Sequence, residues 1–145
     1  MRKTLNRLIQ SKAPAATILI RILVGAVFLS EGIQKYIDPA GVGEGRFAKI
    51  GFSHPEFTAH FAGAFEIACG TLLILGLLTR LATIPLLIVI GAAIYTTKLP
   101  ILENRGFWPM AHEARTDFAM LLGLVFLLIV GAGSLSFDKG ISSSK

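Results

Sequence analysis

Cysteine, charge and strand-like alternation are all scarce in this 145-residue chain, and each shortage excludes a class of protein. A single cysteine, Cys69, leaves no intrachain disulfide, no CxxC redox pair and no cysteine-rich metal site. No stretch alternates apolar and polar residues with the period of two that a half-buried β-strand shows. The net charge is +5, but the basic residues are spread out without an aromatic-basic face, so nucleic acid is not an expected partner.

Apolar side chains are abundant instead. The chain is 53% hydrophobic and only 16% charged, and its mean hydropathy is +0.68. A soluble domain of this length has too high a ratio of surface to volume to bury so much apolar material. A bilayer removes the difficulty, because lipid accepts apolar side chains on the outside of the protein. The composition therefore predicts a membrane protein of one domain.

Four apolar segments suit membrane-spanning helices, since about 20 residues at 1.5 Å each cross the roughly 30 Å hydrocarbon core of a bilayer. We expect the spans at residues 15–36, 57–78, 81–97 and 117–133. Helix-breaking stretches such as Asp38-Pro39-Ala40-Gly41 end them. The sequence thus predicts an all-α fold, an antiparallel four-helix transmembrane bundle over residues 15–138.

The remaining segments are expected to lie outside the bilayer. Residues 1–14 include four Lys or Arg, which is typical of a cytoplasmic flank, so we place both termini in the cytoplasm. Residues 99–116 are expected to form a loop, and residues 139–145 a flexible tail. Residues 42–50 are predicted to form a short helix on the membrane surface.

The first span carries charges inside its apolar sequence. One narrow stripe of this helix holds Arg21, Gly25, Phe28, Gly32 and Lys35. The glycines leave a groove in which another helix backbone can pack. Glu31 lies four residues before Lys35, where a helix brings two side chains together.

Polar groups from all four spans are expected to meet in the outer half of the bundle. Counting along antiparallel helices puts Glu31 and Lys35 there, with Glu66 somewhat deeper. An ionised side chain near the bilayer centre costs about 2.5–3.5 kcal/mol, so Glu66 should face the bundle interior beside a cation. These three are the candidate catalytic residues, because such groups can exchange protons with a bound quinone. The candidate substrate-binding residues are His60, Tyr95, Trp108 and Arg115.

Simpler interpretations stand beside this one. The outer charges can fix helix register without catalysing anything. Arg21, Arg80 and Asp138, at the cytoplasmic side, are expected to form structural charge pairs near the head groups. His60 and His112 are weak candidates for haem ligation, or with Glu113 for metal binding, and we expect no metal site.

Three motifs, in order, resemble the DoxX family of small membrane proteins. They are Arg21-x3-Gly25-x2-Phe28-x3-Gly32-x2-Lys35, then Glu66-x3-Gly70 through Thr79-Arg80, then Gly131-Ala-Gly133-Ser134-Leu-Ser136-Phe-Asp138. Together they cover most of the chain. The resemblance implies a bacterial inner-membrane protein with four helices and an association with quinone-linked oxidoreduction. Founding members are described as the small subunit of a thiosulfate:quinone oxidoreductase, but no catalytic residue set carries over, and thiosulfate chemistry has no support in these residues.

Three functional hypotheses follow. The leading one is a subunit or module of a quinone-linked oxidoreductase system, with quinone as the candidate cofactor and a redox subunit as partner. The second is a non-catalytic membrane scaffold that recruits a soluble redox enzyme. The third is a small-solute or lipid carrier, acting as a homo-oligomer because four helices enclose little space. Whether the chain is an enzyme is left open by its sequence.

Overall fold

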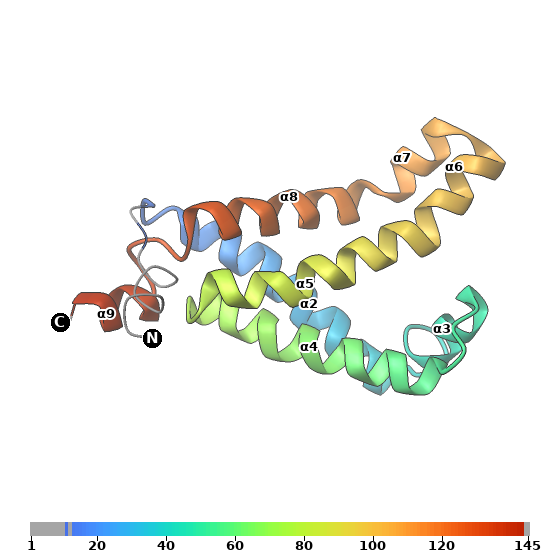
Figure 1. Ribbon diagram of the computed structural model, residues 1–145, viewed down its shortest axis with the longest axis horizontal. Helices are drawn as coiled ribbons and strands as arrows, with labels where there is room; N and C mark the ends of the chain where they lie inside the picture. Colours follow the sequence, from blue (N-terminus) through green and yellow to red (C-terminus); the bar gives the residue numbers. More distant parts are fainter. Residues whose placement is uncertain (1–10, 12, 144–145) are drawn as a thin grey trace.

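The computed structural model describes residue 11 and residues 13–143, and its regular elements there are all helices, as the sequence predicts (Figure 1). In chain order they are α2 (Thr17–Ile37), α3 (Glu44–Ile50), α4 (Pro55–Leu75), α5 (Thr79–Ala93), a π-helix (Ile94–Lys98), α6 (Leu99–Arg105), α7 (Phe107–Glu113), α8 (Arg115–Val130) and α9 (Phe137–Ser143). Most of the predicted basic flank, residues 1–14, lies outside the described residues.

Among the described residues, three helices are long and apolar enough to cross a membrane. They are Thr17–Ile37, Pro55–Leu75 and the continuous helix Thr79–Arg105, which joins α5, the π-helix and α6. The next long helix, α8, has 16 residues and a length of about 24 Å.

Two segments differ from the sequence-based expectation. Residues 99–116 form α6, α7 and the start of α8 instead of a loop. Pro100 is the second residue of α6, and the helix Thr79–Arg105 continues through it. At the C-terminus, α9 extends to Ser143, through most of the stretch expected to be a flexible tail.

The long helices pack in two pairs, α2 with α4 and α5 with α8, and the pairs touch through α4 with α5 and α2 with α8. Figure 1 shows α2 and α5 running in one direction and α4 and α8 returning in the other. We call the end where α2 and α5 begin, beside α9, the near end. The opposite end, which carries α3, α6 and α7, is the far end. The two pairs diverge toward the far end (Figure 1).

One hydrophobic core joins the two pairs. Its buried residues are Val24, Phe28, Cys69, Leu73, Ala82, Leu86, Ile90, Met120, Leu124 and Leu127. On their own helices Phe28, Cys69, Ile90 and Met120 are the members nearest the far end, so the core stops where the pairs diverge. The outward faces of the same helices carry exposed Leu, Ile and Phe side chains, which suits a surface in contact with lipid.

Glycines let α2 and α4 approach closely. A Cβ atom on Gly32 would lie 2.8 Å from the carbonyl oxygen of Gly63, and one on Gly70 would lie 2.8 Å from that of Gly25. The two glycines on each helix are seven residues apart, which is two helical turns, so both contacts lie on one seam. The groove predicted from Gly25 and Gly32 is therefore filled by the backbone of α4.

Replacing Gly32 with leucine is expected to lower the melting temperature of the protein in mild detergent. The added side chain has no room against Gly63, and overpacking of this kind costs about 1–3 kcal/mol. Gly91→Leu is the matched control, because a Cβ atom at Gly91 meets nothing within 4 Å. Equal losses of thermal stability in the two variants would contradict the packing assigned to Gly32.

Candidate functional site

A buried ion pair joins α2 to α4. Lys35 Nζ lies 2.6 Å from Glu66 Oε2, and the two side chains are 7% and 5% exposed. The close approach of α2 and α4 at their glycines permits this ion pair. A Cβ atom on Gly32 would lie 2.9 Å from the Glu66 Cβ atom, so a larger residue at position 32 would push Glu66 away. Among the described residues, no donor other than the Lys35 ammonium lies close to Oε2.

Further charges surround this pair. Lys35 also donates a hydrogen bond to the backbone carbonyl oxygen of Glu31 at 3.3 Å. The half-buried Glu31 carboxylate and the Arg46 guanidinium on α3 both act on Glu66 electrostatically, with opposite signs. The three candidate catalytic residues are therefore neighbours, and Arg46 is an additional cation that the sequence motifs did not single out.

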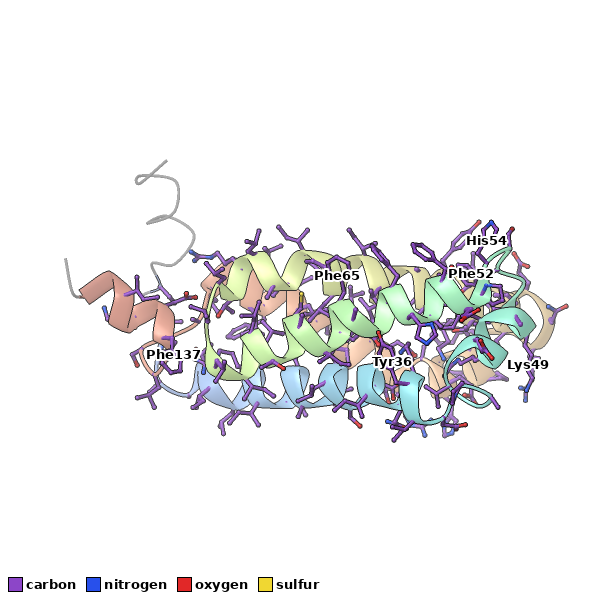
Figure 2. All side chains as sticks on the ribbon, turned by 90° about the horizontal axis from the view of Figure 1, so that it is seen from below. Tyr36, Lys49, Phe52, His54, Phe65 and Phe137 are labelled. Atoms are coloured by element: carbon purple, nitrogen blue, oxygen red, sulfur yellow. The ribbon has the colours of Figure 1, made fainter. Side chains whose placement is uncertain are left out.

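Tyr36 links the same two helices closer to the far end. Its hydroxyl donates a hydrogen bond to the backbone oxygen of His60 at 2.7 Å, and its ring lies 5.1 Å from the His60 ring. Figure 2 shows the Tyr36 side chain between α2 and α4. His60 lies six residues, almost two helical turns, before Glu66 on α4, and its side chain is exposed. The sequence analysis did not select Tyr36, and the one signal for it was its position directly after Lys35 in the first span.

The other predicted binding residues lie elsewhere. Tyr95 is 70% exposed and Trp108 is 80% exposed, the latter in an edge-to-face pair with Phe107. Arg115 is exposed and donates to the backbone oxygen of His112. None of the three has a described contact with Lys35 or Glu66. The divergence of the helix pairs accounts for this, since all three belong to the half of the chain that contains α5 to α8.

A second ion pair, which the sequence analysis did not select, joins the π-helix to α8. Lys98 Nζ lies 3.1 Å from Asp117 Oδ2, and the side chains are 11% and 19% exposed. A π-helix adds a residue to one turn and leaves backbone carbonyls without their usual partners. Here the hydroxyls of Thr96 and Thr97 donate to the carbonyl oxygens of Ala92 and Ala93.

Charged side chains at the near end bind backbone groups. Arg21 is 2% exposed and donates hydrogen bonds to four carbonyl oxygens, those of Leu73, Ile74, Ala132 and Leu135. Arg80 donates to the carbonyl oxygens of Leu128 and Ile129, at the end of α8. Asp138 accepts from the backbone N–H groups of Leu78 and Thr79, at the start of α5. Arg21, Arg80 and Asp138, expected from the sequence to form structural charge pairs, thus bind backbone groups at helix ends, and Arg21 and Asp138 also act on each other electrostatically.

Two other features bear on ligand binding. No cluster of three or more His, Cys, Asp or Glu side chains that could hold a metal ion occurs in the part of the chain that the structure describes. An open depression of about 530 Å³ lies between α3 and the start of α4, lined by Glu44, His54 and Glu56 among others. Figure 2 shows His54 at this exposed extremity, well away from the side of α2 and α4 that carries Tyr36.

Comparison with known proteins agrees with this architecture. The model of the DoxX family matches residues 16–99. The chain belongs to the DoxX family. It is 52% identical over 142 residues to "Uncharacterized membrane protein Rv3486" of Mycobacterium tuberculosis, an alignment covering 94% of this chain and 87% of that protein. It is 29% identical over 129 residues to "Putative oxidoreductase CatD" of Bacillus subtilis, with 89% of each chain covered. No solved structure gives a significant match. This DoxX chain is a membrane protein.

Breaking the Lys35–Glu66 pair from either side is expected to destabilise the protein strongly. Glu66→Leu leaves a buried ammonium without its carboxylate, and Lys35→Met leaves the reverse, each costing roughly 3–5 kcal/mol. The double variant Lys35→Met/Glu66→Leu should recover most of the loss, because it leaves no buried charge unpaired. Thermal unfolding of all four proteins in detergent measures the coupling. Additive losses in the double variant would show that the two charges do not depend on each other.

Arg21→Lys is expected to lower the melting temperature although it preserves the charge. A lysine ammonium cannot reach four carbonyl oxygens on two segments of chain, α4 and the stretch after α8, as the planar guanidinium does. Arg105→Lys, at an exposed position in the last turn of α6, is the control. If both substitutions leave the melting temperature unchanged, Arg21 does not hold the near end together.

Proposed function

We propose that the chain is a membrane subunit or module of a quinone-linked oxidoreductase system, and that Lys35 and Glu66 form its proton-exchanging site. One observation carries the proposal: a lysine and a glutamate, each less than a tenth exposed, meet on two membrane-spanning helices. Ionisable groups are costly inside a bilayer and usually mark a pathway for ions, protons or substrate. The name of the Bacillus subtilis relative, which includes the word oxidoreductase, adds support for redox chemistry.

The chemistry of these residues fits a quinone headgroup. A quinone takes up two electrons and two protons when it is reduced, and the electrons come from a redox partner protein. Glu66 is suited to exchange a proton, because it is a buried carboxyl group whose Oε2 atom contacts no described donor other than Lys35. Lys35 stabilises negative charge left on the carboxylate or developing on a ligand oxygen. Glu31, which is half-buried, connects Glu66 to solvent.

Three residues from the sequence-based set are left out of this site. Tyr95 is exposed on the other helix pair, and Trp108 and Arg115 contact Phe107 and His112 there, so none of the three has an assigned role in proton exchange. His60 stays at the edge of the site through its contact with Tyr36.

The proposal includes a topology. Residues 15–138 form one membrane domain in which α8 is the fourth span of an antiparallel bundle, in the bacterial inner membrane. The near end faces the cytoplasm, which puts the basic residues 1–14 and both termini there, as the distribution of Lys and Arg favours. The ion pair then lies toward the outer side.

One observation favours the scaffold hypothesis as a second candidate. The helices α6 and α7 project at the far end, and they carry the exposed Phe107–Trp108 pair. Exposed aromatic side chains of this kind are typical anchors for a partner protein or for lipid head groups. Under this hypothesis the ion pair is structural, and quinone is not bound.

Bound quinone in the purified protein separates the two candidates. The protein is purified in mild detergent, extracted with organic solvent, and analysed for quinone by chromatography with mass detection. We expect about one quinone per chain in the wild type, and its loss in folded Glu66→Gln, which keeps the shape of the side chain but cannot exchange the proton. Glu103→Gln, at an exposed position on α6, should retain it. Quinone no higher than the lipid background in folded wild-type protein would favour the scaffold.

A further inference from the structure

Exposed apolar side chains gather on the segment that joins the third long helix to α8. We call residues 99–113, which form α6 and α7, the far-end hairpin. Gly106, with a φ of +85°, separates its two helices (Figure 1). The large exposed apolar side chains of the hairpin are Leu99, Leu102, Phe107 and Trp108. None of these four belongs to the hydrophobic core that joins the helix pairs, so core packing does not account for them.

The length of the helix that leads into the hairpin gives its depth in a bilayer. The helices α2 and α4 have 21 residues each, about 31 Å, which matches the roughly 30 Å hydrocarbon core. Counted from Thr79 at the near end, at about 1.5 Å per residue, the same distance is reached at Leu99. A tilt of about 20° moves this level by only about one residue. The hydrocarbon core therefore ends where the hairpin begins.

The returning helix gives the same depth independently. With 16 residues and a length of about 24 Å, α8 is about 6 Å shorter than the hydrocarbon core is thick. Only Ala114, whose backbone is in the right-handed helical region, separates α7 from α8. The remaining depth is therefore supplied by α7, which places this helix at the edge of the hydrocarbon core and not clear of the membrane.

The lipid-facing surface of the span continues into the hairpin. Tyr95 and Leu99 are both exposed, about one turn apart on the continuous helix Thr79–Arg105. Beyond them, the Phe107 and Trp108 rings form an edge-to-face pair with centroids 5.2 Å apart. Tryptophan is enriched where a membrane meets water, because its ring is apolar and its N–H group can still bind a polar partner.

The charges of the hairpin distinguish between possible partners. The exposed charged side chains from residue 99 to residue 115 are Glu103, Arg105, Glu113 and Arg115. Two acids and two bases leave no net charge, with His112 neutral. The adjoining Lys98 and Asp117 pair with each other. Such a surface has no net attraction for a strongly charged protein or for anionic lipid, whereas a zwitterionic head-group layer requires none.

We propose that the far-end hairpin docks on the lipid surface, with Trp108 in the head-group layer of a zwitterionic bilayer. This interaction goes beyond the proposed function and does not depend on quinone. It assigns the exposed Phe107–Trp108 pair to lipid instead of to a partner protein. Contact with lipid removes from water a group of apolar side chains that would otherwise form an exposed patch.

The fluorescence of Trp108 tests the proposal, because this residue is the single tryptophan of the chain. The full-length protein is reconstituted in phosphatidylcholine vesicles whose acyl chains carry bromine either close to the head group or close to the chain end. We expect the shallow bromines to quench Trp108 at least about twofold more strongly than the deep ones. Acrylamide in the water should quench it at least about threefold less than it quenches free N-acetyltryptophanamide.

The double variant Trp108→Phe/Ile88→Trp is the matched control. It moves the single tryptophan to another exposed position on the same continuous helix. Ile88 lies about 14 Å from Thr79, close to the middle of the hydrocarbon core. Deep bromines should therefore quench this variant more strongly than shallow ones. The opposite order would show that the depth count is wrong, and the inference would fail with it.

The remaining outcomes identify other environments for the hairpin. If acrylamide quenches wild-type Trp108 as strongly as the free indole and brominated lipid does not quench it, the hairpin lies in water and is open to a protein partner. Stronger quenching by deep bromines places Trp108 inside the hydrocarbon core. Either result overturns the proposal. Shallow quenching that rises more than about twofold when phosphatidylglycerol is added contradicts the assignment to a zwitterionic surface. None of these measurements uses bound quinone, so they stand or fall separately from the proposed function.

Discussion

The rest of this structure depends on the hydrogen bonds that the buried Arg21 guanidinium donates to backbone carbonyl groups. A bilayer offers no water to helix ends, so each carbonyl group left over at the end of a helix needs a donor from the protein itself. The Arg21 guanidinium supplies that donor to α4 and to the segment after α8, from inside α2. Three segments distant in sequence are fixed to one another at this point. Because α2 is continuous from Thr17 to Ile37, the same anchor sets the height of Lys35 against Glu66, about 21 Å farther along.

The two ends of the molecule follow from this arrangement. At the near end, charged side chains satisfy backbone groups, glycines allow close approach, and the shared core lies beside them. Beyond the core, toward the far end, two buried ion pairs join helices. Buried ion pairs rarely add stability compared with apolar residues of similar size. Their position therefore supports the proposal that the Lys35–Glu66 pair has a role besides holding the helices together.

Much of this arrangement could be predicted from the sequence, and the misses have physical reasons. The stripe from Arg21 to Lys35 follows from the helical period, and the pairing of Glu66 with a cation follows from the cost of a charge in lipid. The second ion pair could not be found, because a single π-helical turn decides where Lys98 points. Tyr95 and Arg115 were assigned to the outer site by their depth along the helices of an ideal antiparallel bundle. Depth along a helix does not show how far apart two helices lie sideways. The hydrogen bonds of Arg21, Arg80 and Asp138 to backbone groups were missed, because a sequence pattern suggests charge pairs more readily than it shows which backbone groups lack partners.

The unequal lengths of the helices have a consequence for how the molecule sits in its membrane. The helix Thr79–Arg105 has 27 residues and a length of about 40 Å, whereas α2 and α4 have 21 residues each and measure about 31 Å. A hydrocarbon layer that matches the shorter helices is too thin for the longer one, and such hydrophobic mismatch is relieved by tilt or by protrusion. A tilt of the longer helix away from α2 and α4 has the same direction as the divergence at the far end. We therefore expect lipids with longer acyl chains, which match the longer helix better, to favour a smaller angle between the two halves.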